Sequence, residues 1–252
     1  MKLLLDISFL GSSYCGYQVQ PNVPTVQGAL NEAAKQLFGF DCDVVGCSRT
    51  DSGVHAKQFF VSIAKKGEAC LYTTIPEEKI QSALSVYLPK DICINSARFV
   101  DDGFHPRYDV KSKEYVYCIL NSKNGDPFLH DRAWHYSRNI DDNAIENMRV
   151  ALKALEGTHD FSSYMASNSC VESTVRTIYS TRIERDADII KIYIEGNGFL
   201  YNMVRIIVGT LISVAEGRVS CMDMEIITSS CDRSMAGMTV PPQGLFLNKV
   251  TY

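Results

Sequence analysis

This sequence lacks the long apolar runs and the low-complexity tracts that would indicate a membrane-embedded or disordered protein. No stretch of about 20 apolar residues occurs in the 252-residue chain, so no membrane-spanning helix is predicted. The apolar run Leu3–Leu5 ends at Asp6, which is too soon for the core of a signal peptide. No low-complexity tract is present, and 46% of the residues are hydrophobic, which is enough for a substantial core. We therefore expect an ordered globular protein of one large or two smaller domains.

The patterns that signal metal sites and disulfides are also missing. The nine cysteines are scattered and form no C-x-x-C pair, and the five histidines lack the spacing of a zinc site. An odd number of scattered cysteines is typical of a reducing compartment. These absences predict a cytoplasmic protein without disulfides or a structural metal.

An excess of positive charge, which is typical of proteins that bind polyanions over their whole surface, is absent as well. The chain has 25 Lys and Arg against 29 Asp and Glu, a formal net charge of −4. A local basic groove on an acidic body can nevertheless bind RNA, with marked salt sensitivity. Taken singly, each basic residue is better explained as part of a solvated face. The basic residues in question fall mainly in the middle of the chain, at Arg107, Lys111, Lys113, Arg132, Arg138, Arg176, Arg182 and Arg185.

Predicted strands and helices are interleaved along the chain. Thr25 is the expected N-cap of the first helix, and Gly157 is expected to end the third. Interleaved strands and helices, with hairpins among them, predict an α+β fold. Helices are predicted at 26–38, 76–87, 141–155, 200–215 and 222–229, and strands at 3–9, 43–45, 59–63, 92–100, 114–120, 133–137, 173–185, 189–195 and 246–250.

One turn carries a carboxylate in a setting suited to chemistry. Asp51 lies between two β-prone segments, and Arg49 stands two residues before it. Because a nearby guanidinium favours the ionised carboxylate, Asp51 is predicted to act as an attacking or stabilising anion rather than as a proton donor. The alternative is ordinary turn chemistry, since Asp-Ser-Gly also favours a tight turn in which Gly53 takes a positive φ.

Two residues in the second half of the chain also stand out. Arg205 interrupts the apolar helix predicted at 200–215, and a charge in that setting needs a partner. The alternative is a side chain that extends along the helix until its charged end reaches the surface. Tyr115 lies in the predicted strand at 114–120, where an aromatic ring is either part of the core or available for stacking.

Six motif-bearing segments follow one another from end to end of the chain. They are Phe9–Gln18 with Thr25–Gly28, Gly46–Ala56, Phe104–Arg107 with Lys113–Tyr117, Gly157–Phe161, Gly198–Gly209 and Pro241–Leu245. Together they resemble the TruA family of tRNA pseudouridine synthases, whose signature G-R-T-D-A-G-V-H-A is similar to the segment around Asp51. Six matches in order are specific, whereas one alone is weak. The chain departs from the family where it has Leu10 in place of Asp and Tyr17 in place of Trp.

The resemblance implies an isomerase that converts uridine to pseudouridine in the anticodon stem-loop of tRNA, at positions 38, 39 and 40. It implies base flipping, no cofactor and no metal, with Asp51 as the nucleophile and Arg205 as its ion-pair partner. Arg49 would fill the vacated stack or bind the displaced phosphate. Tyr115 would stack on the flipped uracil or help to remove the C5 proton through its hydroxyl, and both roles stay open. Attack at C1′ and attack at C6 need the same anion, so both routes stay open.

The family also implies an architecture and partners. It predicts two ferredoxin-like (RRM-like) halves joined around a cleft, with halves at residues 1–105 and 106–252 and the boundary in the loop 101–111. The expected assembly is a homodimer. A catalytically inactive RNA-binding module is one alternative, although no RNP1 aromatic pattern is present. A hydrolase that uses Asp51 is another, and it would require a second carboxylate or a metal that the sequence does not place.

Overall fold

The computed structural model describes residues 1–166 and 171–252, and the chain is divided into two units. Unit 1 consists of Met1–Lys111 together with Leu247–Tyr252, and unit 2 consists of Ser112–Phe246. The α+β prediction is confirmed as a mixed fold with mostly antiparallel strand pairing. The division predicted between residues 105 and 106 stays a prediction.

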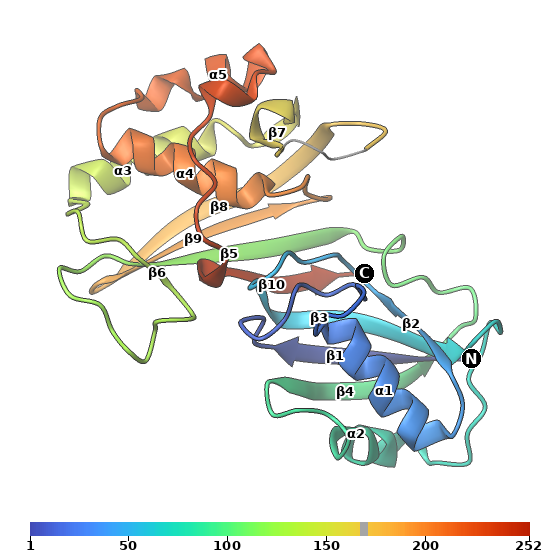
Figure 1. Cartoon of the computed structure of the whole chain (residues 1–252). Helices are drawn as coiled ribbons and strands as arrows, with labels where there is room; N and C mark the ends of the chain where they lie inside the picture. Colours follow the sequence, from blue (N-terminus) through green and yellow to red (C-terminus); the bar gives the residue numbers. More distant parts are fainter. Residues whose placement is uncertain (167–170) are drawn as a thin grey trace. The chain divides into compact units, whose positions relative to one another are not determined.

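Unit 1 is built on an antiparallel sheet. The strand β1 pairs antiparallel with both β3 and β4, and β2 pairs antiparallel with the other edge of β3. The helices α1 and α2 contact each other and pack against this sheet (Figure 1). The elements are β1 (Lys2–Phe9), α1 (Val26–Phe38), β2 (Cys42–Gly46), β3 (His55–Lys65), α2 (Glu77–Ser85), β4 (Ile92–Val100) and most of β10 (Leu245–Thr251).

Local signals explain where α1 begins and ends. The predicted N-cap is confirmed, because Thr25 Oγ1 accepts a hydrogen bond of 3.2 Å from the backbone N–H of Gly28. Gly39, with φ 78°, ends the helix in the left-handed conformation. The buried residues recur at helical spacing, which turns one face of α1 toward the core: Val26, Leu30, Ala33 and Ala34.

Unit 2 contains a set of paired strands covered by helices. Its strands are paired in the order β5-β9-β8-β7, all antiparallel, and β6 pairs parallel with β5. The helices α3 and α4 cover one face of this sheet (Figure 1). The elements are β5 (Ser112–Leu120), β6 (Trp134–His135), α3 (Asp142–Lys153), β7 (Gly157–Asp160), β8 (Val175–Asp186), β9 (Ile189–Gly196), α4 (Met203–Ala215) and α5 (Met224–Ser230). Short 3₁₀ helices span Ser162–Tyr164, Cys221–Asp223, Arg233–Met235 and Pro242–Gly244.

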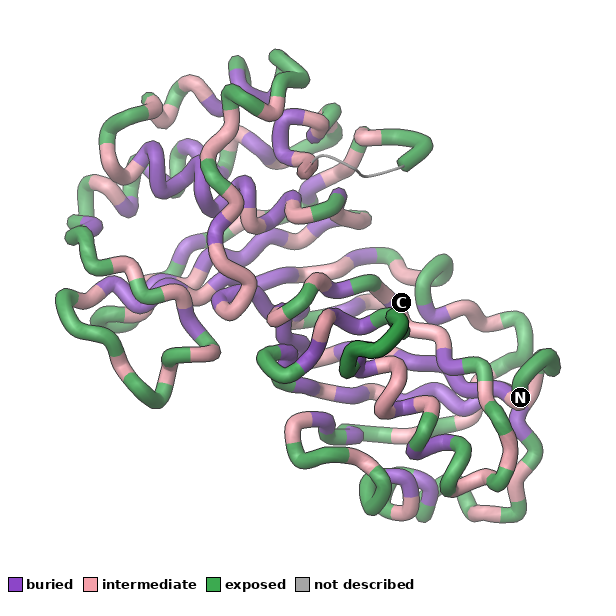
Figure 2. Tube along the Cα trace, in the orientation of Figure 1, coloured by how far each residue is buried: buried purple, intermediate pink, exposed green. Residues whose placement is uncertain are grey.

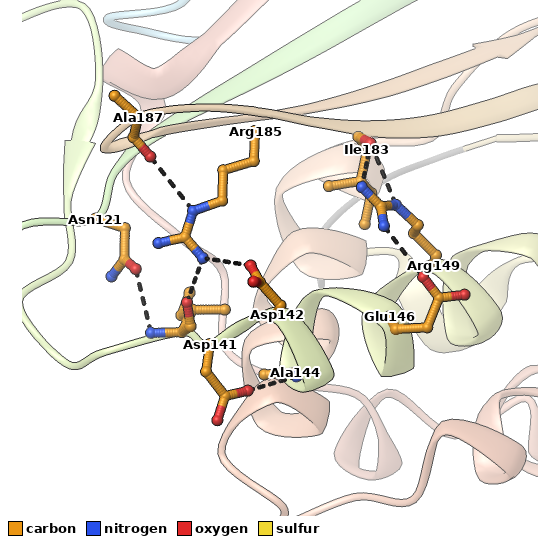
Figure 3. A network of polar contacts seen from close by, with 10 residues as sticks. Asn121, Asp141, Asp142, Ala144, Glu146, Arg149, Ile183, Arg185 and Ala187 are labelled. Carbon is orange, nitrogen blue, oxygen red and sulfur yellow. Dashed lines mark hydrogen bonds and ion pairs between the residues drawn. The ribbon is translucent and has the colours of Figure 1, made fainter.

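Polar contacts join α3 to the neighbouring strand β8. The Arg185 guanidinium donates a 2.6 Å hydrogen bond to the carbonyl of Ile140, just before α3 (Figure 3). About two turns into the helix, Arg149 donates to the carbonyl of Ile183 in β8 (Figure 3). The core helix α4 is more apolar, and Figure 2 shows a nearly continuous buried path along it.

Three predicted boundaries in unit 2 need correction. Gly157 does not end α3, because the helix already ends at Lys153, with Ala154 as its C-cap. Gly157, with φ 108°, instead begins β7. The helix predicted from residue 200 begins only at Met203, since Asn202 takes the left-handed φ of 60°. The strand predicted at 133–137 is limited to Trp134–His135.

Candidate active site

Asp51 lies on the tight turn between β2 and β3 in unit 1. The carbonyl of Asp51 accepts a 3.1 Å hydrogen bond from the backbone N–H of Val54, and Gly53 has φ 78°. The turn chemistry expected of Asp-Ser-Gly is therefore present. Asp51 is neither fully buried nor fully exposed, whereas Arg49, on the same turn, is exposed.

The segment 14–17 supports this turn from one side. The N–H of Tyr17 donates to the carbonyl of Thr50 at 3.2 Å, and the N–H of Gly53 donates to the carbonyl of Tyr14 at 3.3 Å. Gly16 is required at this approach, because it has φ 89° and a Cβ there would lie 2.6 Å from the Thr50 carbonyl oxygen. The backbone on both flanks of Asp51 is thus held by the same short segment.

A glycine and a histidine fix the far end of the turn. The Gly11 N–H donates a 2.9 Å hydrogen bond to Nδ1 of His55, which is 0% exposed. Because Nδ1 is the acceptor, the imidazole carries its proton on Nε2 and is neutral. A Cβ on Gly11 would lie 2.0 Å from the carbonyl oxygen of Val54. Backbone packs directly on backbone here, which restricts movement of the residues after Asp51.

Tyr115 belongs to unit 2, where it occupies β5 opposite Ile194 of β9. Its residue exposure is 7%, and its ring meets the ring of Phe199 edge to face, with centroids 5.1 Å apart. Edge-to-face contact is a favoured arrangement of two aromatic rings, so it defines the orientation of Tyr115.

Arg205 is held in the first turn of α4, also in unit 2. Its Nε donates to the carbonyl of Val240 at 2.8 Å, and its Nη1 donates to Oδ1 of Asn202 at 2.7 Å. The chain before Val240 lies directly on the helix, because a Cβ on Gly209 would stand 1.8 Å from the carbonyl oxygen of Met238. The arginine predicted to need partners therefore has two of them within its own unit.

The predicted site residues are divided between the two units. Asp51 and Arg49 share one turn of unit 1, whereas Tyr115 and Arg205 belong to β5 and α4 of unit 2. The ion pair between Asp51 and Arg205 stays a prediction. Within residues 1–166 and 171–252, no three His, Cys, Asp or Glu side chains are grouped so that they could hold a metal ion. In the same described part of the chain, no helix has the length and apolar character needed to cross a membrane.

The sequence did not predict which residues hold the turn that carries Asp51. Gly11, Gly16 and Tyr17 lie in the opening motif, but nothing in a linear pattern indicates which later segment each one contacts. The available signal was the presence of two glycines in a loop that follows a strand, since such glycines often permit a close approach of backbone.

Comparisons with known proteins agree with these motifs. The profile of a family described as "tRNA pseudouridine synthase" matches residues 151–252. The protein named tRNA pseudouridine synthase A from Thermoanaerobacter sp. (strain X514) is 44% identical over 251 residues, covering 100% of this chain and 99% of that protein. The protein of the same name from Clostridium acetobutylicum is 41% identical over 248 residues, covering 98% of both.

One solved structure shows a low likeness. A chain in "Crystal Structure of a Cbf5-Nop10-Gar1 Complex" aligns with 81% of this chain and 52% of its own length, at a TM-score of 0.34 and 11% identity. That score supports no inference. The sequence relationships do, because identities of 41% to 44% extend over nearly the whole of both chains. This chain therefore belongs to the tRNA pseudouridine synthase A family.

Proposed function

We propose that this protein isomerises uridine to pseudouridine in the anticodon stem-loop of tRNA, at positions 38, 39 and 40. One observation carries the proposal: a protein named tRNA pseudouridine synthase A is 44% identical over 251 residues, which cover 100% of this chain and 99% of that protein. The activity is that of an isomerase. The choice of uridines rests on the resemblance of the motifs around Asp51, Tyr115 and Arg205 to those of the family.

The reaction moves one bond and leaves the atoms of the nucleoside unchanged. The bond between N1 and C1′ breaks, a bond between C5 and C1′ forms, C5 loses a proton and N1 gains one. No net oxidation or reduction occurs, so an anion, a proton acceptor and accurate positioning are sufficient in principle. The proposed nucleophile is the Asp51 carboxylate, which attacks C1′ or C6. The contacts of Gly11 and Gly16 with the turn support this role, because they fix the backbone that carries the carboxylate.

The remaining site residues have roles in holding the substrate. A base in a stem must leave its stack before Asp51 can reach it, at a cost of a few kcal/mol. Arg49, exposed two residues before Asp51, is proposed to fill the vacated stack or to bind the displaced phosphate. The Tyr115 ring, oriented by Phe199, is proposed to stack on the flipped uracil. Arg205 is proposed to pair with Asp51 and keep it ionised.

The finer architecture is also a proposal. Unit 1 is proposed as one ferredoxin-like half, which is supported by its element order β1-α1-β2-β3-α2-β4 and by the strand order β4-β1-β3-β2. Unit 2 is proposed as the second half. A homodimer in the cytoplasm is expected on family grounds, and the assembly is testable by measuring the mass of the protein in solution.

The decisive experiment compares the wild-type protein with Asp51→Asn and Asp51→Ala on an unmodified tRNA transcript, with pseudouridine mapped at each position. We expect modification of uridines 38–40 by the wild type and none by either variant. Asp101→Ala is a matched control, because Asp101 is an exposed carboxylate of the same unit. Thermal unfolding of each variant verifies that it is folded. Equal modification by wild type and a folded Asp51 variant would disprove the assignment of the nucleophile.

A further inference from the structure

A basic, partly aromatic cavity lies in unit 1 beside the turn that carries Asp51. It has a volume of about 250 Å³, and it is formed by the end of β2, the residues that precede α1 and the loop 104–108. Arg49 and Arg107 contribute two cations to its wall, and none of the described residues that line it is acidic. A cavity with this charge favours an anionic ligand or the anionic part of a larger one.

The cavity wall contains a buried hydroxyl group without a protein partner. Tyr17 is 3% exposed, its ring packs 4.5 Å from that of Phe59, and its hydroxyl has no hydrogen-bond partner in the described part of the chain. A Cβ on Gly46 would lie 2.5 Å from Cζ of Tyr17. The hydroxyl end of Tyr17 therefore stands at the part of the wall that Gly46 forms. Buried polar groups normally have partners, so this hydroxyl indicates a polar ligand.

Another part of the wall is a pre-formed loop. Nδ1 of His105 accepts hydrogen bonds from the backbone N–H groups of Arg107 at 3.1 Å and Tyr108 at 3.2 Å. The Tyr252 hydroxyl donates to the carbonyl of Pro106 at 2.7 Å, which ties the loop to the end of the chain. Burial lowers the pKa of His105, in agreement with its acceptor role at Nδ1. The positions of Arg107 and Tyr108 are thus set by the backbone before any ligand binds.

The loop presents a flat aromatic surface next to a cation. Tyr108 is 76% exposed, and its ring stacks on that of His105 with centroids 4.2 Å apart and planes at 28°. The guanidinium carbon of Arg107 lies 6.0 Å from the same ring, at the outer limit of a cation–π contact. An exposed ring beside an arginine is the combination that binds a base by stacking and its phosphate by charge.

We infer that this cavity binds the nucleotide adjoining the target uridine in the RNA strand. The base stacks on Tyr108, the phosphate lies between Arg49 and Arg107, and the Tyr17 hydroxyl bonds to a polar atom of the nucleotide. The Cα atoms of Arg49 and Asp51, two residues apart, are at most about 7 Å from each other. This distance matches the spacing of neighbouring nucleotides in an extended RNA strand. This inference rests on the proposed function, because it assigns the flanking part of the same substrate.

Binding measurements with matched variants test the stacking surface. The dissociation constant of an anticodon stem-loop RNA is expected to rise about tenfold or more for Tyr108→Leu and less than about twofold for Tyr108→Phe, because only the latter keeps the ring. Tyr72→Leu is the control, since Tyr72 is 73% exposed in the same unit. In steady-state assays the Tyr108→Leu defect should appear in KM much more than in kcat.

Two further variants test the charge and the buried hydroxyl. Arg107→Gln should weaken binding about tenfold and reduce its salt dependence, whereas Arg98→Gln, an exposed arginine of unit 1, should not. Tyr17→Phe should weaken binding about threefold without lowering the unfolding temperature, because the hydroxyl it removes has no protein partner to lose.

Photocrosslinking identifies the occupant directly. RNA with 5-iodouridine on either side of the target uridine should crosslink to Tyr108 from one of the two positions, as read by mass spectrometry. If the wild-type protein isomerises uridine, and Tyr108→Leu and Arg107→Gln keep the wild-type dissociation constant and KM, the inference about this cavity is overturned and the proposed function is not. A wild-type protein that binds the RNA without isomerising it would instead overturn the proposed function.

Discussion

Substitution of Gly11 by alanine tests how strongly the Asp51 turn depends on its neighbour. The added Cβ would lie 2.0 Å from the Val54 carbonyl oxygen and 2.6 Å from the Val54 carbonyl carbon. Ordinary contact begins near 3.4 Å, so the two backbones must separate by about 1.4 Å. Both partners are backbone, and Val54 is hydrogen-bonded to Asp51, so the separation is transmitted to the turn.

The size of the effect follows from that displacement. A misplacement of about 1 Å in a catalytic group can cost about 100-fold in rate. We therefore expect the single-turnover rate of Gly11→Ala to fall about 100-fold, with a smaller change in the dissociation constant of the RNA. Overpacking of this kind also destabilises a protein by about 1–3 kcal/mol, so the unfolding temperature should fall by several degrees.

The assay is single-turnover isomerisation of a tRNA transcript by folded protein, with the dissociation constant of the RNA measured in parallel. Gly103→Ala is the control, because a Cβ on Gly103 meets no atom within 4 Å. A folded Gly11→Ala protein that isomerises uridine at the wild-type rate would refute the view that this contact positions Asp51.

Two predictions concern stability in unit 2. Asn121 is 6% exposed and makes three hydrogen bonds to the backbone of residues 136–140, one of which Figure 3 draws. In urea titration, Asn121→Ala should therefore lower the free energy of unfolding by about 3 kcal/mol, whereas Asn124→Ala should not. The hydrogen bond from Tyr136 is the main cause that lowers the pKa of Glu216 below its usual 4.5. The ionised Glu216 carboxylate stabilises the fold above pH 4.5, and this stabilisation is lost as pH falls through the lowered pKa. In urea titrations below pH 4.5, the free energy of unfolding should therefore depend less steeply on pH for Glu216→Gln than for wild type.

Local features of the structure were predictable because their causes are local. Thr25 begins α1 through a contact only three residues away, and Gly39 ends it by its own backbone conformation. The apolar run of α4 required burial whatever its neighbours, and most of that helix is buried. Periodicity and capping act within one or two turns, so the sequence displays them directly.

Long-range contacts were not predictable in the same way. The hydrogen bonds that make Gly157–Asp160 a strand come from β8, so the preference of Gly157 to end a helix was overridden. The segment 247–252 belongs to unit 1 although it follows unit 2 in the chain. The wall of the cavity likewise brings Tyr17, Gly46 and Tyr108 together from three separate segments. Such pairings depend on register and shape, which no short motif encodes.

The two interpretations of Asp-Ser-Gly concern different atoms of one residue. The turn closes through the backbone carbonyl of Asp51, which accepts from Val54, whereas the proposed chemistry needs the side-chain carboxylate. A turn that closes through the backbone does not compete with catalysis, because it determines where the carboxylate points. Asp51→Asn separates the two roles: it keeps the backbone bond and the side-chain shape but removes the charge. Loss of isomerisation at an unchanged unfolding temperature would assign the turn to the backbone and the reaction to the carboxylate, whereas equal loss of both would mean that the side chain is mainly structural.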